Sequence, residues 1–143
     1  MEYDEMLMRS CSPSEAWWDP AVERPSSQLF KPTPKDEGKL SVADGSKTTP
    51  EGFFNEFTET MGLQSRGIWG VTKEEIAPVE GVARKREDGS EEEVSLKYEE
   101  DEGEGKPLGH CLLDMSGLSK SLIKRVAKTL RNKAVEHGCL YGP

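Results

Sequence analysis

The chain has 143 residues, of which 34% are hydrophobic and 32% are charged, and its formal net charge is −8. This length suits one domain with its own core, but the low hydrophobic fraction predicts that some segments stay solvated. The negative charge argues against a general binder of nucleic acid or of anionic membranes, because contacts to phosphate need a basic surface.

Residues 1–27 are predicted to form an irregular, poorly ordered segment, because prolines stand at positions 13, 20 and 25. The segment opens with acidic residues and lacks the basic start and apolar centre of a signal peptide. No apolar run approaches the roughly 18 residues that a membrane span needs. We therefore expect a cytoplasmic protein without a membrane span, whose folded domain occupies residues 28–143.

Within that domain, short apolar or alternating runs bounded by glycine and proline are typical of β-strands. Five such stretches occur, near residues 28–31, 39–42, 67–72, 82–98 and 109–115. The stretch 82–98 contains Asp88–Gly89, a typical hairpin turn, so we expect two antiparallel runs there.

Two segments have the pattern of amphipathic helices. In residues 50–61, Thr49 is a suitable N-cap, Pro50 suits the first helical position, and phenylalanines recur at helical spacing. In residues 119–137, Ser119 is a plausible cap, apolar residues form one stripe, and Gly138 suits the end. The sequence therefore predicts an α+β domain, a mixed or antiparallel sheet with both helices packed on one face.

Charge is unevenly distributed along the chain. Residues 87–104 contain ten acidic residues and one lysine, whereas residues 119–137 contain six basic residues and one acidic residue. We expect the acidic stretch to lie in a solvated hairpin and loop at 84–107. The basic stretch predicts a helix with a charged outer face.

The histidines and two of the three cysteines raise the question of a metal or thiol site. His110 and Cys111 are adjacent in a predicted strand, so their side chains should point to opposite faces. A zinc site made by Cys111, His137 and Cys139 is a weak alternative, because its spacing differs from the usual paired ligands. The favoured interpretation is that the cysteines are reduced, structural thiols.

No catalytic set or cofactor motif stands out, so we expect no cofactor. An enzymatic alternative would use His110 together with Asp36, Glu37 or Asp114, because acid–base catalysis needs a positioned imidazole or carboxyl pair.

The favoured interpretation is a non-enzymatic inhibitor, immunity-type protein or accessory subunit that acts by protein–protein contact. Large aromatic side chains outside a core often anchor interfaces, and charge segregation steers association with a partner of complementary charge. A nucleic-acid accessory role through helix 119–137 is a further alternative, weakened by the net charge. The expected partner-binding residues are Trp17, Trp18, Lys124, Arg125, Lys128 and Arg131.

Overall fold

The fold is taken from a computed structural model of the chain, which describes residues 3–33, 37–103 and 105–142. The strands are β1 (Met6–Ser10), β2 (Trp18–Asp19), β3 (Arg24–Pro25), β4 (Lys39–Asp44), β5 (Ile68–Thr72), β6 (Ala83–Lys85), β7 (Glu91–Glu93), β8 (Lys97–Glu100) and β9 (His110–Asp114). The helices are the 3₁₀ helix η1 (Ser27–Phe30), α1 (Pro50–Asn55), the π-helical segment η3 (Glu56–Thr60) and α2 (Lys120–His137).

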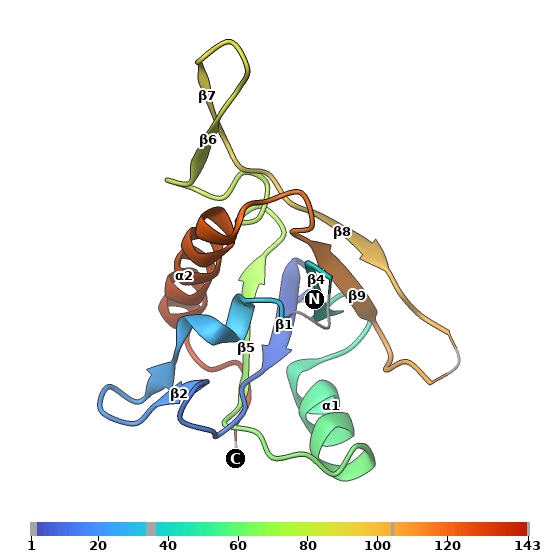
Figure 1. Cartoon of the computed structure of the whole chain (residues 1–143). Helices are drawn as coiled ribbons and strands as arrows, with labels where there is room; N and C mark the ends of the chain where they lie inside the picture. The colour runs from blue at the N-terminus through green and yellow to red at the C-terminus, as the bar shows by residue number, and fades with distance from the viewer. Residues whose placement is uncertain (1–2, 34–36, 104, 143) are drawn as a thin grey trace.

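A five-stranded antiparallel sheet in the order β5-β1-β4-β9-β8 forms the centre of the fold (Figure 1). Leu7 of β1 pairs with Asp44 of β4 on one side and with Val71 of β5 on the other. The predicted α+β class is confirmed, and the sheet is antiparallel throughout.

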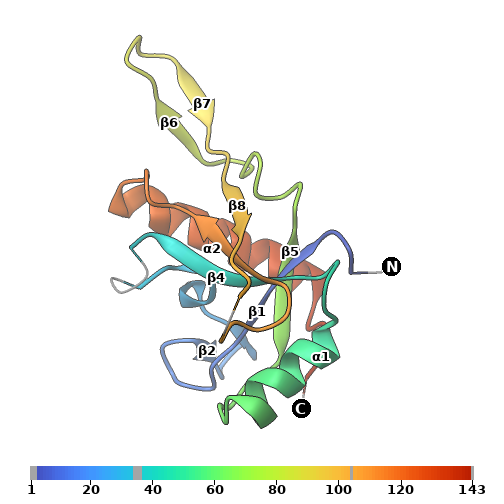
Figure 2. The ribbon, with the colours of Figure 1, turned by 90° about the vertical axis from the view of Figure 1, so that its right-hand side faces the viewer.

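The two helices lie on opposite faces of this sheet (Figures 1 and 2). Leu7 packs in the core cluster that contains Leu130 of α2, whereas Met8 packs in a second cluster with Phe54 of α1. Successive strand side chains point to opposite faces, so β1 is apolar at consecutive positions because both of its faces are covered. The expectation that both helices share one face is therefore wrong.

Local sequence explains where each helix begins and ends. The Thr49 side chain accepts a hydrogen bond from the Gly52 amide at the start of α1, and Pro50 takes the first position. Ser119 caps α2 in the same way through the Leu122 amide, and Gly138, with φ of 84°, ends it.

The segment expected to be irregular, residues 1–27, contains β1 in an interior position of the sheet. The three prolines that suggested irregularity all follow β1 in sequence, and proline disrupts a strand only where it stands. A domain boundary at residue 28 would therefore cut β1 from its partners.

The strand expected at 28–31 is instead the 3₁₀ helix η1. The Ser26 side chain accepts a hydrogen bond from the Gln28 amide and starts the turn. Leu29 and Phe30 are fully buried in the cluster that α2 also joins. Both apolar residues face the core from one helical turn, which a short apolar run does not distinguish from a strand.

The hairpin expected at 82–98 has two parts. β6 and β7 form a separate two-stranded hairpin that projects from the body (Figures 1 and 2), and Val82 and Val94 are buried at its base. Residues 97–100 form β8, an edge strand of the main sheet. Its Tyr98 side chain is 38% exposed.

Acidic residues at the end of β8 and in the loop that follows it pair with lysines outside α2. Lys39 binds Glu99 at 3.0 Å, and Lys47 binds Glu100 at 2.6 Å. Among the described residues, no ion pair joins the stretch 87–103 to α2. The acidic stretch and the basic helix therefore do not neutralise each other within the chain.

We predict that Leu7→Ala destabilises the protein by about 2–5 kcal/mol, because it opens a cavity under a fully buried side chain. Val22→Ala, at an exposed side chain in the same N-terminal segment, should change stability by less than about 0.5 kcal/mol. Urea unfolding followed by circular dichroism measures both. Equal, small effects would mean that residues 1–27 do not belong to the core.

Candidate functional site

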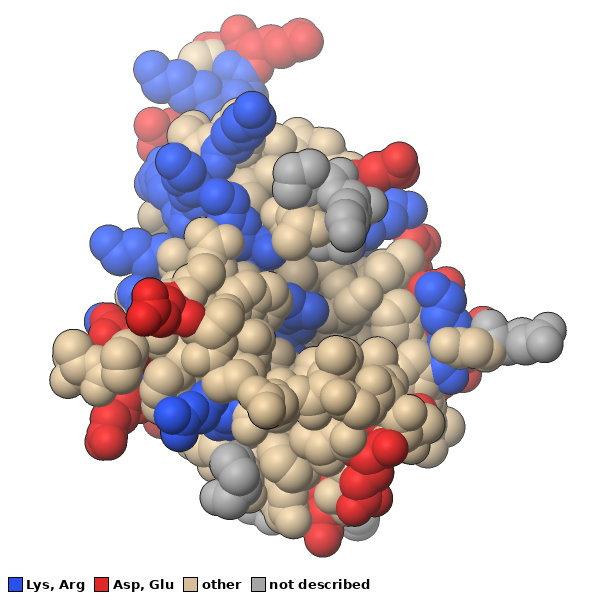
Figure 3. Space-filling model, turned by 60° about the horizontal axis from the view of Figure 1, so that its bottom comes forward, with Lys and Arg blue, Asp and Glu red and all other residues tan. Residues whose placement is uncertain are grey.

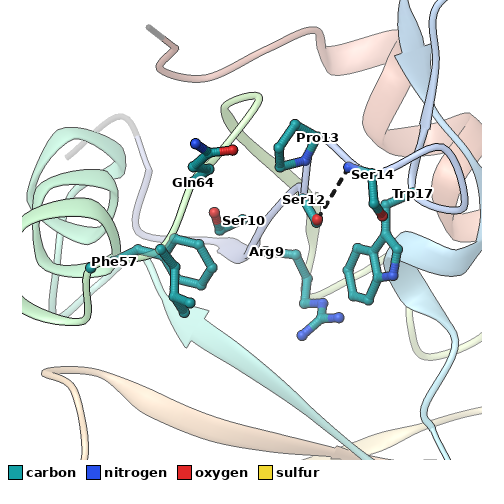
Figure 4. A pocket seen from close by; sticks show the side chains of 10 residues that line it. Arg9, Ser10, Ser12, Pro13, Ser14, Trp17, Phe57 and Gln64 are labelled. Carbon is teal, nitrogen blue, oxygen red and sulfur yellow. Dashed lines mark hydrogen bonds between the residues drawn. The ribbon is translucent and has the colours of Figure 1, made fainter.

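Two adjoining hollows form a groove between the N-terminal segment and the α1–η3 side of the molecule. Their cavity volumes are about 1010 Å³ and 270 Å³, and Arg9, Ser10 and Phe57 line both. Figure 4 shows the larger hollow, with Trp17 and Phe57 on opposite sides and Arg9 between them. We refer to these two hollows together as the Arg9 groove.

Arg9 is held at the floor of the groove by the fold itself. Its Nε donates a hydrogen bond to the Leu29 carbonyl at 2.8 Å, and its Nη1 donates to the Ser41 carbonyl at 3.0 Å. The guanidinium carbon also lies 5.1 Å from the centre of the Trp17 ring, within the range of a cation–π contact. These three contacts fix the plane of the guanidinium at the floor of the groove.

The walls of the groove are largely aromatic and apolar. Trp17 lines one side of the larger hollow, and Phe57 and Leu63 line the other. Phe53 and Met61 extend this wall into the smaller hollow. Met61 and Leu63 are 50% and 46% exposed at the rim, so the groove presents uncovered apolar surface to a ligand.

The smaller hollow adds two further basic side chains, Lys106 and His110. Nδ1 of His110 lies 3.0 Å from the backbone oxygen of Asp101 and 3.2 Å from its carboxylate. Both of these oxygens are acceptors, so Nδ1 carries the proton and the ring is held in one orientation. Lys106 also binds the Asp101 carboxylate, at 3.2 Å.

No acidic residue occurs among the described residues that line the two hollows. Figure 3 shows the same face as a mostly uncharged surface, hollowed near its centre, with basic atoms inside the hollow. The arrangement suits a ligand that combines negative charge with a flat or apolar part.

His110 therefore lies in a groove, but without the carboxylates expected beside it. Asp114 is four residues further along β9, roughly 13 Å away, and its carboxylate accepts hydrogen bonds from Ser116. Glu37 is exposed and lines a different hollow, and Asp36 lies outside the described residues. The orienting residue is Asp101, and an enzymatic role for His110 stays a prediction.

The proposed zinc ligands occupy separate environments. Cys111 is fully buried in the core on the α2 side, His137 Nε2 lies 2.8 Å from a Glu75 carboxylate oxygen, and Cys139 contacts the Tyr141 carbonyl. Within the described ranges, no group of three His, Cys, Asp or Glu side chains could hold a metal ion. As strand alternation predicts, the neighbouring side chains of His110 and Cys111 are separated: His110 lines the groove, and Cys111 lies in the core.

The tryptophans expected to anchor a partner pack partly against the protein's own core. The Trp18 ring lies 6.2 Å from that of Trp69, with a tilted geometry. Trp17 is half-buried and forms a wall of the groove. Both indoles are thus fixed in place, and Trp17 keeps a surface available to a ligand.

The basic residues expected on one helix face divide between two. Lys124 and Lys128 are exposed. Arg125 turns the other way and its Nη2 donates to the Gly81 carbonyl at 3.5 Å. Arg131 is half-buried, and its Nη1 donates to the Pro25 carbonyl at 3.3 Å.

Arg9 is the residue of this groove that sequence reasoning missed. It stands in "MLMRS", where it is a single cation directly after three apolar residues. Arginine is rarely buried unless its donors are satisfied, so an arginine in an interior strand points to a specific role. Assigning residues 1–27 to an irregular segment removed that context.

The chain was also compared with protein-family models, curated proteins and solved structures, and none of them matches it. Over the part of the chain that the structure describes, no helix combines the length and apolar character needed to cross a bilayer.

The three thiols should differ in reactivity. Burial raises the pKa of all three thiols, to about 12 for Cys11 and to about 11 for Cys111, but Cys139 is exposed whereas the other two are buried. Because the thiolate is the reactive form, we predict that a thiol reagent at pH 8 labels Cys139 first. Mass spectrometry should find one modified cysteine in the folded protein and three in guanidinium chloride. Rapid labelling of Cys11 in the folded state would contradict the packing described.

Proposed function

We propose that the protein binds a small organic anion that carries a flat ring, and that the Arg9 groove is the binding site. The observation that carries this proposal is the fixed guanidinium of Arg9 between the aromatic walls of Trp17 and Phe57. Guanidinium groups recognise carboxylates and phosphates through charge-assisted hydrogen bonds.

We propose that the two hollows hold different parts of the ligand. The ring of the ligand would lie in the larger hollow against Trp17, because a stacked base or ring gains about 1–3 kcal/mol on an aromatic side chain. Its anionic group would lie at Arg9, where the hollows meet, with Lys106 adding positive charge and His110 a polar ring nitrogen in the smaller hollow. Ser10 and Ser41 supply polar groups beside them.

The size of the groove supports a small molecule. Ligand sites commonly measure about 300–1,000 Å³ and combine apolar walls with a few convergent polar groups. The larger hollow, at about 1010 Å³, stands at the upper end of this range.

The proposal predicts that at least one flat-ring anion binds more tightly than its fragments. Isothermal titration calorimetry would compare AMP, flavin mononucleotide, pyridoxal phosphate and indole-3-acetate with adenosine, indole and inorganic phosphate. A ring joined to an anion should bind at least about tenfold more tightly than either part, because one ligand then uses both features of the groove. If no ring-bearing anion of this set exceeds its fragments, the proposal is wrong.

Variants locate the binding once a ligand is found. Arg9→Lys keeps the charge but loses the planar fork, so affinity should fall at least about tenfold. Trp17→Leu should weaken binding by a similar factor, and Lys106→Ala by about threefold. Lys97→Ala, which removes an exposed lysine on β8, is the matched control. Because Arg9 also holds the backbone, melting curves must accompany the titrations; unchanged affinity in Trp17→Leu and Lys106→Ala would place the ligand elsewhere.

A further inference from the structure

A row of basic side chains follows one face of α2, away from the Arg9 groove. Lys120, Lys124, Lys128 and Arg131 stand at positions i, i+4, i+8 and i+11, which superpose on one face of a helix. We call these four residues the basic stripe. Lys31, from the end of η1, lies beside Lys120 and Lys124 around a hollow of about 570 Å³. In Figure 3, basic side chains gather on the α2 side of the molecule.

The stripe differs from the other basic residues of the same helix. Lys133 binds Glu80 at 3.2 Å, and Arg125 contacts the Gly81 carbonyl. In contrast, none of the described residues forms an ion pair with Lys120, Lys124 or Lys128, all of which are exposed. The described residues that line the hollow beside Lys120 and Lys124 include one acidic residue, Glu37.

This arrangement is unfavourable for the isolated helix. Like charges at i and i+4 repel, and the stripe contains two such pairs, Lys120 with Lys124 and Lys124 with Lys128. The outward face of α2 needs only to be polar for the fold, since its packing uses the opposite face. Negative charge from outside the chain would relieve the repulsion.

We propose that the basic stripe docks an acidic segment of a partner protein, whose carboxylates are spaced like one face of a helix. Positions i and i+4 rise about 6 Å along the axis, and the stripe spans roughly 16 Å. An acidic helix with Glu or Asp at i and i+4 matches this spacing. A short acidic segment also fits better than a long nucleic acid, because a polyanion running beyond the stripe meets a chain of net charge −8.

The contact would be a protein–protein interaction of the kind expected from the sequence, with a changed set of residues. Lys120 and Lys31 join Lys124 and Lys128, whereas Arg125 faces away. Arg131 marks the far end, where its contact with Pro25 fixes its position. This proposal does not depend on the Arg9 groove, so either one can fail alone.

The test uses the full chain and a synthetic helical peptide of about 20 residues with Glu at i and i+4. Fluorescence anisotropy should show saturable binding that weakens as salt rises from about 50 to 200 mM. A peptide of the same composition with its Glu residues spread around the helix should bind at least threefold more weakly. A single-stranded DNA 20-mer of similar charge should also bind more weakly.

Two double variants separate position from net charge. Lys124→Glu/Lys128→Glu should lower affinity for the peptide at least tenfold. Lys85→Glu/Lys97→Glu changes the net charge equally at exposed sites off α2 and should lower affinity less than twofold. Circular dichroism melting confirms that both variants fold. Absence of peptide binding, equal losses in the two variants, equal binding of both peptides, or tighter binding of the DNA would each overturn the proposal.

Discussion

The contact between Arg9 and two backbone carbonyls is the constraint on which the groove depends. Through Leu29 and Ser41, one side chain of β1 ties the 3₁₀ helix η1 to β4, and through Trp17 it fixes the loop that follows β1. The charged guanidinium of Arg9 is stable inside the fold because hydrogen bonds satisfy its N–H donors. Those bonds therefore serve two purposes: they stabilise the junction of three elements, and they hold a cation between aromatic walls.

The sequence was most informative where local rules decide the structure. The caps Thr49 and Ser119 and the apolar stripe of α2 identified both helices almost to the residue, because helix ends depend on a few adjacent side chains. It was least informative where placement depends on partners far along the chain. β1 is short and flanked by polar residues, and only pairing with β4 and β5 makes it a strand. The groove could not be predicted, since its lining comes from segments that the fold alone brings together.

Charge is sorted in space as well as in sequence. The acidic stretch is partly neutralised by Lys39, Lys47 and Lys106 on the β4 and β9 side of the molecule. The basic stripe belongs to α2, which lies on the face of the sheet opposite to α1. The described part of the acidic stretch and the basic stripe thus stay unpaired with each other within a domain of 143 residues, which leaves two kinds of surface available: an aromatic, basic groove and a basic helix face.

The position of β1 in the sheet also has a consequence for how the chain folds during its synthesis. β1 is synthesised before both of its neighbours in the sheet, since the strand on one side begins at Lys39 and that on the other at Ile68. Until β5 leaves the ribosome, the apolar residues of β1 have at most one neighbour and an open edge, the condition in which strands associate with other chains. Pairing over such sequence separations is slow. A chaperone that holds the nascent chain until β5 has emerged would therefore protect the strand that carries Arg9.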